Sequence, residues 1–415
     1  MHFSQDGNQR SEDLEMLSRA SKSKTGCPAL RMKRAVAGLI FAVTGALNGQ
    51  VKPIELIPAS PPASYGYTEI AGLRELLNGN LLLLDRGDRA VYLVNLKKNT
   101  RTQIGRIGSG PNEYILPDRV LPLATDSTGI LDVAAHRVLV IGTRGPTGFR
   151  DARAPSNSTG VPSSQNLITF SDTLGWFYAR AQPIRVLRDN RLEVADSFAI
   201  ERWTQFSRKR DTIALLPFSR ASEATVIGGI VTWPVRRGEA FPAEIAWTVS
   251  EDGQLAVVYP APYRIDLITS DGRFRRGPVL AYRAQQVTDA HKQEWLALLR
   301  RPKSGLMQHE PGGPVTAITI RPRARDAQGI RWPLRLPSFI PDQIRFDLLG
   351  RLWVQRYVAV ASHSLFDVIG ENGSVLFEVS APSRSRLVGF GRGLVFLVRQ
   401  DADDVEWLQA FRLPQ

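Results

Sequence analysis

The chain has 415 residues, of which 43% are hydrophobic, and it carries 34 glycines and 27 prolines. This composition is typical of a globular protein with many turns and excludes a disordered or collagen-like chain. The formal net charge is +13, but only nine of the 53 basic residues are lysines, and the arginines are scattered. The sequence has no long basic run, zinc-finger spacing or RNA-binding aromatic motif. It therefore argues against a nucleic-acid partner. Arginine binds anions, but scattered arginines are explained more simply by the composition of proteins from GC-rich genomes.

The N-terminal region divides into two segments. Residues 1–31 are polar without periodicity, and we interpret them as an untranslated or disordered extension. Within 32–49, two basic residues precede an uncharged run from Ala35 to Leu47, and small residues follow. This order is typical of a secretory signal peptide cleaved near Gly49, and the run is too short to span a bilayer. A buried core helix is the alternative.

The single cysteine, Cys27, lies before this apolar run. A chain cleaved near Gly49 has no thiol, and therefore no disulfide, no thiolate metal site and no cysteine nucleophile. We expect residues 50–415 to be secreted or periplasmic, to have no transmembrane segment and to be monomeric.

Short strand-like runs recur after residue 50, each introduced by a turn that contains Gly, Asn or Asp. Such turn residues tolerate positive φ, and in hairpins a β-strand follows them. Aligned on the turn, six units are NGNLLLL (78–84), STGILDV (127–133), DNRLEVA (189–195), DGQLAVV (252–258), LGRLWVQ (349–355) and GRGLVFL (391–397).

Each unit continues as a set of antiparallel strands. In the first unit, RELL precedes the turn, and LLLLD, AVYLVN and TRTQIGRI follow it, which gives four strands. Four-stranded units repeated radially predict a β-propeller, whose blades need neighbours to bury their faces. The sixth unit has three strands, and we expect VKPIELIP (51–58) to supply the fourth and close the ring. The predicted fold is all-β, a six-bladed β-propeller of four-stranded antiparallel blades over residues 50–415.

Residues 283–341 interrupt the repeat between the fourth and fifth units. TDAHKQEWLALLRR predicts a helix with Thr288 as its N-cap and an apolar stripe formed by Trp295, Leu298 and Leu299. The following GLMQHEPGGPVTAITIRPRARDAQG is rich in loop residues. We expect a helical and loop insertion packed on the ring, with a lid over one face as the alternative.

GRIGSGPNEY (105–114) contains the Gly-x-Gly pattern of a phosphate-binding loop. Such a loop needs a helix directly after its glycines, because the N–H groups and the dipole of that helix bind the anion. ILPDRVLPLA follows instead, with two prolines and no helical period. We interpret the segment as a turn that joins the first blade to the second.

Several segments carry a family resemblance: GRIGSGPNEY, WTVSEDGQLAVV (247–258), TDAHKQEWL, and DLLGRLWVQRY (347–357) with LFDVIGENGSVL (365–376). On these segments the sequence resembles secreted bacterial six-bladed β-propeller proteins related to the NHL-repeat type. The resemblance covers roughly residues 65–414. It implies the fold and an exported location rather than a reaction, because a fold does not determine a function.

In a propeller, the loop after the second strand of every blade lies on one rim of the ring. These loops are rich in arginine, tyrosine and acidic residues, which suits a polar or anionic ligand. Ordinary solvated loops with ion pairs between blades are the alternative. The candidate ligand-binding rim consists of Asp85, Arg86, Asp88, Arg89, His136, Arg137, Tyr259, Tyr263, Arg356, Tyr357, Arg399 and Asp401.

The sequence contains no recognisable catalytic motif. The histidines after residue 50 have no metal-ligand spacing, and Ser109 lacks the strand–helix context of a nucleophile elbow. We therefore expect a binding module for a small molecule, a glycan or a protein rather than an enzyme, with catalytic residues unassigned. The alternative is a calcium-dependent hydrolase like the six-bladed lactonases, since scattered acids are compatible with calcium. No other cofactor is evident.

The signal-peptide interpretation predicts that the exported chain begins near Gln50. Intact-mass measurement and N-terminal sequencing of the protein isolated from a secreting bacterial host check this. A full-length chain that keeps residues 1–31 and stays in the cytoplasm would contradict it.

Overall fold

The computed structural model describes residues 52–124, 126–142, 145–155, 168–181, 184–186, 192–207, 209–218, 225–227, 230–232, 239–301, 303–308, 315–320 and 329–415. The predicted extension (1–31) and signal peptide (32–49) lie outside the described residues. No helix in the described ranges is long and apolar enough to cross a membrane.

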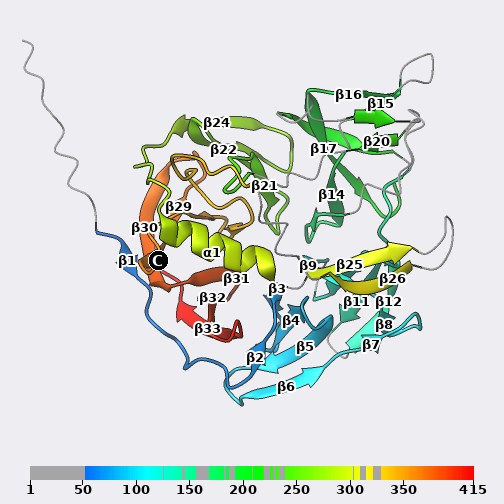
Figure 1. Ribbon diagram of the computed structural model, residues 1–415. Helices are drawn as coiled ribbons and strands as arrows, with labels where there is room; N and C mark the ends of the chain where they lie inside the picture. The colour runs from blue at the N-terminus through cyan, green and yellow to red at the C-terminus, as the bar shows by residue number, and fades with distance from the viewer. Residues whose placement is uncertain are drawn as a thin grey trace, which may run out of the picture. The chain divides into compact units, whose positions relative to one another are not determined.

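Six antiparallel sheets, each with four strands of the repeat, surround a common axis, and this arrangement confirms the predicted six-bladed propeller (Figure 1). From the inner strand outwards, blade 1 is β3 (Ile70–Glu75), β4 (Leu81–Asp85), β5 (Ala90–Asn95) and β6 (Thr100–Gln103); blade 2 is β9 (Pro117–Pro122), β10 (Thr128–Asp132), β11 (Arg137–Gly142) and β12 (Gly145–Asp151); blade 3 is β13 (Phe170–Ser171), β14 (Trp176–Arg180), β17 (Ser197–Thr204) and β18 (Asp211–Pro217).

The second half of the ring repeats this order. Blade 4 is β21 (Ala246–Val249), β22 (Leu255–Pro260), β23 (Tyr263–Ile268) and β24 (Phe274–Val279); blade 5 is β27 (Ile344–Phe346), β28 (Leu352–Gln355), β29 (His363–Ile369) and β30 (Val375–Ser383); blade 6 is β31 (Ser385–Gly391), β32 (Leu394–Gln400), β33 (Glu406–Arg412) and β2 (Gly66–Tyr67). A separate hairpin is formed by β19 (Thr225–Ile227) and β20 (Ile230–Thr232).

Five of the six turn-and-strand runs are the second strands of blades, as predicted, and the third run was assigned wrongly. DNRLEVA contributes β16 (Leu192–Val194), which pairs with β15 (Ile184–Val186) in a hairpin between β14 and β17. The second strand of blade 3 is instead β14, which follows Gly175 at φ +96°. A turn followed by a β-run is a local signal, and it does not distinguish a hairpin in a loop from a strand of a blade.

The N-terminal segment closes the ring, and the predicted run 51–58 supplies part of the contact: Pro58 forms an antiparallel bridge with Phe411 on β33, and the Ile57 carbonyl accepts a 2.9 Å hydrogen bond from the Arg412 N–H. β1 (Ile54–Glu55), from the predicted run 51–58, pairs in parallel with β30 and becomes a fifth strand of blade 5. β2 pairs antiparallel with β33 and completes blade 6. Pro61 and Pro62 separate the two strands, and they have no N–H group to continue a ladder along β33.

Arg101 on β6 clamps the closing strand to blade 1. Its guanidinium carbon lies 4.8 Å from the ring centroid of Tyr65, 5.4 Å from that of Tyr67 and 4.6 Å from that of Tyr92. Its Nη1 donates a hydrogen bond of 3.3 Å to the Gly66 carbonyl. Burial raises the pKa of Tyr67 to about 12. Cation–π contacts therefore join blade 6 to blade 1 at the seam of the ring.

Apolar side chains fill the spaces between neighbouring blades. The ring of Trp353, on β28, lies 5.9 Å from that of Phe366 in blade 5 and 5.4 Å from that of Phe390 in blade 6. All three side chains are buried. The indole of Trp353 donates a hydrogen bond of 3.0 Å to Asp347, in the turn before β28. Each blade thus depends on its neighbour for its core.

GRIGSGPNEY forms the loop that the sequence predicted. It contains a short parallel pair, β7 (Arg106–Ile107) and β8 (Glu113–Tyr114), and β9 follows in place of a helix. The Glu113 carboxylate accepts a 2.7 Å hydrogen bond from the Gly110 N–H and pairs with Arg106 at 2.6 Å. The loop therefore binds a carboxylate of its own chain rather than a phosphate.

The insertion contains the predicted helix, α1 (Asp289–Arg300). Thr288 is its N-cap, and its side chain accepts a hydrogen bond from the backbone N–H of His291. The prediction of a loop after the helix was partly wrong, because β25 (Lys303–Gln308) and β26 (Val315–Ile320) pair there as an antiparallel hairpin. VTAITI is rich in β-branched residues, which favour a strand once a partner strand is available.

Replacing Arg101 by Ala is expected to lower the free energy of unfolding by about 2 kcal/mol, because the contacts with three aromatic rings are lost. Thermal and urea unfolding of the purified protein measure the change. Arg412→Ala, at an exposed position on β33, is the control and should have little effect. Equal stabilities of the two variants would show that the contacts of Arg101 with the tyrosine rings do not stabilise the seam between blades 6 and 1.

Candidate functional site

One face of the propeller carries the loops after the second strands and the beginnings of the inner strands. The helix α1 packs on this face, which we call the α1 face (Figure 1). Its His291 Nε2 donates a hydrogen bond of 3.1 Å to the carbonyl of Val358, in the loop after β28. Arg301, directly after the helix, pairs with Asp404 at 3.3 Å, in the loop after β32. The helix therefore spans the loops of blades 5 and 6.

An aromatic cluster fixes α1 to the ring. The ring centroid of Phe241, which precedes blade 4, lies 5.5 Å from that of Tyr357, 6.2 Å from that of Trp332 and 6.4 Å from that of Trp295 on α1. Phe241 has a φ of 50°, a left-handed conformation that costs a non-glycine residue free energy. The strained backbone places this buried ring between the ring loops and the insertion.

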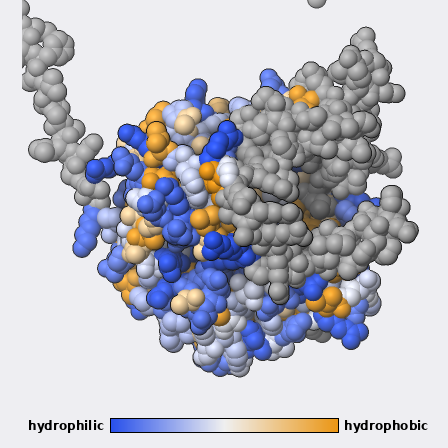
Figure 2. All heavy atoms as spheres, viewed as in Figure 1, coloured by the Kyte–Doolittle hydropathy of each residue, from blue (hydrophilic) through white to orange (hydrophobic). Residues whose placement is uncertain are grey.

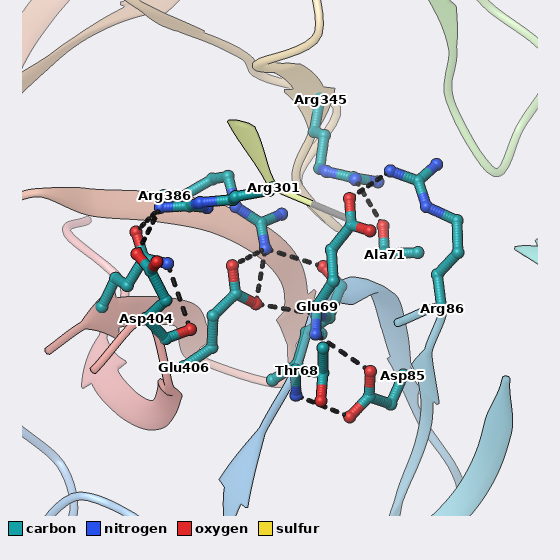
Figure 3. A network of polar contacts seen from close by, with 12 residues as sticks. Thr68, Glu69, Ala71, Asp85, Arg86, Arg301, Arg345, Arg386, Asp404 and Glu406 are labelled. Carbon is teal, nitrogen blue, oxygen red and sulfur yellow. Dashed lines mark hydrogen bonds and ion pairs between the residues drawn. The ribbon is translucent and has the colours of Figure 1, made fainter. Parts of the chain in front are cut away.

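Charged side chains from blades 1, 5 and 6 gather near the beginnings of the inner strands on the α1 face (Figure 3), and Asp118 and Arg119 of blade 2 are joined to them by ion pairs. They are joined by ion pairs or by the effect of their charges on each other's pKa. We call this group the arginine site, and it consists of Glu69, Arg86, Asp118, Arg119, Arg345, Arg386 and Glu406.

The carboxylates of blades 1 and 2 are neutralised by arginine. Arg86, after β4, pairs with Glu69 and, at 3.4 Å, with Asp118 on β9, and Arg119 also pairs with Asp118 at 3.2 Å. Burial alone would raise the pKa of Glu69. The hydrogen bond and charge of Arg86, with the charges of Arg386 and Arg301, lower this pKa below its ordinary value instead. Glu69 is therefore ionised at neutral pH.

The carboxylate of blade 6 is held in the same way. Arg386 on β31 donates to both carboxylate oxygens of Glu406 at 2.7 Å and to the Ile70 carbonyl at 2.9 Å. Glu406 is buried and also accepts a 2.7 Å hydrogen bond from the Ile70 N–H. This exchange of hydrogen bonds connects blade 6 to the inner strand of blade 1.

Arg345 on β27 differs from the other arginines of the site. Its Nη2 donates a hydrogen bond of 3.2 Å to the Ala71 carbonyl, and its enclosed Nε has no hydrogen-bond partner among the described residues. No described carboxylate forms an ion pair with it. Burial, followed by the charges of Arg386 and Arg119, lowers the pKa of Arg345 to about 10, against the opposing charge of Asp342. The seven residues of the arginine site comprise four guanidinium groups and three carboxylates, and the charge of Asp342, outside this group, offsets part of the charge of Arg345 without forming an ion pair with it.

This arrangement suits an anion and does not suit calcium. A calcium ion needs several free oxygen ligands, whereas every carboxylate of the arginine site already has a guanidinium partner. The guanidinium of Arg345 would also repel a cation. Across the described ranges, no three His, Cys, Asp or Glu residues are placed to hold a metal ion. A carboxylate or phosphate, by contrast, forms charge-assisted hydrogen bonds with arginine.

The predicted rim residues all lie on or beside the loops of the α1 face, but only Arg86 belongs to the arginine site. Asp85 is buried and accepts 2.9 Å hydrogen bonds from the N–H groups of Thr68 and Glu69, so it positions Glu69. Asp88 accepts a 2.7 Å hydrogen bond from the Thr68 hydroxyl. Arg89 ends this loop at a φ of 53°.

In blade 2, His136 occupies the position of Arg89, at a φ of 51°. Arg137 lies 3.9 Å from the Phe149 ring centroid and 3.6 Å from a carboxylate oxygen of Asp132. Arg137 also donates a 2.9 Å hydrogen bond to the Glu113 carbonyl, in the loop between blades 1 and 2, and no hydrogen bond or ion pair between described residues joins it to the arginine site.

In blades 4 and 5 the predicted residues hold neighbouring strands together. Tyr263 is buried and donates a 2.8 Å hydrogen bond to Asp367, whose pKa is raised by burial. Arg356 pairs with Asp367 at 3.5 Å and with Glu378 at 2.9 Å. The Tyr259 ring lies under the guanidinium of Arg264, at 4.3 Å.

The remaining predicted residues lie at other places on the α1 face. Tyr357 belongs to the aromatic cluster of α1, and burial raises its pKa. Arg399 is exposed on β32. Asp401 accepts a 2.7 Å hydrogen bond from the indole of Trp407.

Sequence reasoning missed most of the arginine site because it followed the loops after the second strands. Three of the missed residues, Arg119, Arg345 and Arg386, lie in the first half of inner strands. The available signal was an arginine at the start of a strand that is otherwise apolar, as in IRF and SRLVGF. The sequence did not show that these strands face one another.

No family model and no curated protein matches this sequence. Among solved structures, the chain is similar to the calcium-binding protein regucalcin from Agrobacterium tumefaciens, with 8% identity over 88% of this chain and 98% of that one and a TM-score of 0.39. It is similar to virginiamycin B lyase from Staphylococcus aureus, with 12% identity, 82% and 80% coverage and a TM-score of 0.33. A third is a protein of unknown function from Bacteroides thetaiotaomicron, with 11% identity, 86% and 74% coverage and a TM-score of 0.40.

Arg345→Met and Arg386→Met are expected to change stability in opposite directions. Arg345→Met removes a charge that no described carboxylate pairs with, and it should raise the free energy of unfolding by about 1 kcal/mol. Arg386→Met leaves the buried Glu406 without its guanidinium and should lower it by about 2 kcal/mol, less than for a fully buried pair. Urea unfolding at neutral pH measures both. Equal losses in the two variants would show that the charge of Arg345 is compensated within the protein.

Proposed function

We propose that residues 50–415 form an exported binding propeller that takes up a small anionic ligand at the arginine site. The observation that carries the proposal is Arg345, a half-buried cation without a carboxylate partner among the described residues. Its Nη2 is bonded to the Ala71 carbonyl, and its Nε points to no acceptor. A ligand carboxylate or phosphate would accept hydrogen bonds from Arg345 and balance its charge.

The surroundings of the site favour a small ligand over a protein. The arginine site lies near the inner strands, and α1 packs over the loops of blades 5 and 6 on the same face. In the part that the structure describes, this face is mostly hydrophilic, with hydrophobic residues scattered over it and no broad apolar patch (Figure 2). Broad apolar patches mark docking surfaces for proteins.

The residue types at the site support binding rather than catalysis. Arginines and ion-paired carboxylates hold charge, but the seven residues include no serine, cysteine or histidine that would act as a nucleophile or as a base near neutral pH. Export is supported by the signal-peptide pattern over 32–49.

Anion binding is expected to stabilise the protein by mass action. Melting temperatures are measured with millimolar phosphate, sulfate, succinate and citrate, each compared with chloride at equal ionic strength. At least one of these anions should raise the melting temperature of the wild type, and Arg345→Met should abolish the rise. The same rise in Arg345→Met would place the anion elsewhere and overturn the proposal, as would the absence of any rise in the wild type.

Chelation separates this proposal from the calcium-dependent hydrolase. A tightly bound calcium ion would lower the melting temperature when EDTA removes it, and added calcium would restore it. The melting temperature of the anion-binding propeller is expected not to fall when EDTA is added, and EDTA, itself a polycarboxylate, is compared with citrate at equal ionic strength. A fall that calcium reverses would favour the hydrolase.

A further inference from the structure

Three polar side chains lie at the interface between blades 5 and 6, on the side of blade 5 that carries Arg345. The amide oxygens of Gln343 and Gln355 and the hydroxyl of Ser385 are enclosed, and none of them has a hydrogen-bond partner among the described residues. Gln343 is 8% exposed, Gln355 7% and Ser385 2%. A buried polar atom without a partner costs free energy, so three such atoms at one interface indicate a position suited to a bound polar group.

The strand register places the two glutamines on the same side as Arg345. The Gln355 N–H donates a 3.0 Å hydrogen bond to the Gln343 carbonyl, so these residues oppose each other directly beyond the pair of Ile344 and Val354. Gln343 precedes Arg345 by two positions, and side chains two apart along a strand point to one side. Ile344, between them, packs in the core shared with blade 4. Gln343 and Arg345 therefore face blade 6.

Blade 6 meets this surface with Ser385, at the start of β31. Leu387, two residues further on, packs with Trp353 of blade 5, so Ser385 faces blade 5 as well. The Gln355 Nε2 donates a 2.9 Å hydrogen bond to the Ser385 carbonyl. The Ser364 hydroxyl donates to the same carbonyl at 3.0 Å and accepts at 3.0 Å from the Ser385 N–H. These bonds fix the backbone of the interface and leave the Gln355 oxygen and the Ser385 hydroxyl without partners.

The chemistry of these atoms differs from that of the arginines beside them. An amide oxygen only accepts hydrogen bonds, so the two glutamine oxygens need a donor, which an ionised carboxylate or phosphate does not supply. A hydroxyl or an ammonium group on the ligand would supply it. The charges of Arg386 and Arg119 act on Arg345, and together these three cations would repel an ammonium group. A hydroxyl is therefore favoured.

We propose that the ligand of the arginine site is a hydroxy carboxylate, whose carboxylate binds Arg345 and whose hydroxyl donates a hydrogen bond to the Gln343 amide oxygen. This assignment rests on the proposed function and names the chemical class of its ligand. The terminal dihedral of a glutamine rotates over a broad range, and the Gln343 oxygen has no hydrogen bond to lose when it turns toward a ligand. Gln355, fixed by its bond to Ser385, presents a second acceptor on the opposing strand.

Succinate, malate and aspartate test the proposal, because they share one carbon skeleton and differ at one carbon, which carries hydrogen, a hydroxyl or an ammonium group. Calorimetry measures the dissociation constants. The wild type is expected to bind one enantiomer of malate about tenfold more tightly than succinate, the effect of satisfying one buried acceptor. Aspartate should bind more weakly than malate. Equal affinities for succinate and both enantiomers of malate would overturn the inference and leave the proposed function intact, and so would tighter binding of aspartate than of malate.

Gln343→Leu removes the acceptor with little change in size. It should lower the affinity for malate to that for succinate and change the affinity for succinate less than twofold. Retention of the preference for malate, or an equal loss of both probes, would overturn the inference. The matched control is Gln254→Leu, at a half-buried glutamine after the inner strand of blade 4, at the other end of that strand, which should keep the preference. Melting temperatures of the unliganded variants establish that both are folded.

Gln343→Glu tests separately that this side chain lies beside Arg345. A carboxylate at this position would pair with the arginine and should weaken the binding of succinate and malate alike by at least tenfold. Wild-type affinity in this variant would overturn the inference. If phosphate raises the melting temperature of the wild type but neither succinate nor malate binds, the inference fails alone. If no anion binds, the proposed function fails with it.

Discussion

A blade of this protein cannot bury its own faces, and the rest of the structure depends on that constraint. Each sheet is apolar on both sides, so the ring is stable only when every blade has two neighbours. Closure of the ring therefore depends on the contacts at the seam between blades 6 and 1. There β2 completes blade 6, and Arg101 lies against three tyrosine rings that belong to both sides of the seam.

Closure of the ring also creates the arginine site. The first residues of the inner strands are brought together only when all blades are in place, because they come from positions as distant as Glu69 and Arg386. Most of the charges found there neutralise one another, and Arg386 with Glu406 ties blade 6 to blade 1. Arg345 does not fit this pattern. A charge that lowers stability without a partner is typical of a site shaped for a ligand.

The insertion between blades 4 and 5 adds a helix to one face of the ring. A helix laid over the loops of blades 5 and 6 is held mainly by aromatic contacts, with Phe241 at their centre. Arg301, directly after the helix, donates to the Gln400 side chain and pairs with the exposed Asp404. The helix thus covers loops of blades 5 and 6 on the α1 face.

The sequence by itself determined the repeat, the six blades, the helix with Thr288 as its cap and the turn at GRIGSGPNEY. These features depend on local chemistry: turn residues that accept positive φ, alternating strand patterns and a capping side chain. The same local signals misplaced blade 3, because DNRLEVA has the pattern of a strand after a turn and forms a hairpin instead. They located only part of the closing strand: Ile57 and Pro58 of the predicted run pair with β33, whereas 54–55 extend blade 5 and 66–67 complete blade 6, and only the ring determines which edge each one meets.

Only the tertiary structure determined which residues lie together in the candidate site. The loops after the second strands were correctly expected on one face, but their side chains mostly bond within and between blades, as Tyr263 and Arg356 do with Asp367. The residues that converge are arginines at the beginnings of inner strands, and a single one of them in the sequence looks like any other basic residue. Which arginine has a carboxylate partner depends on contacts between blades that are far apart in the chain, and such pairings leave no local pattern.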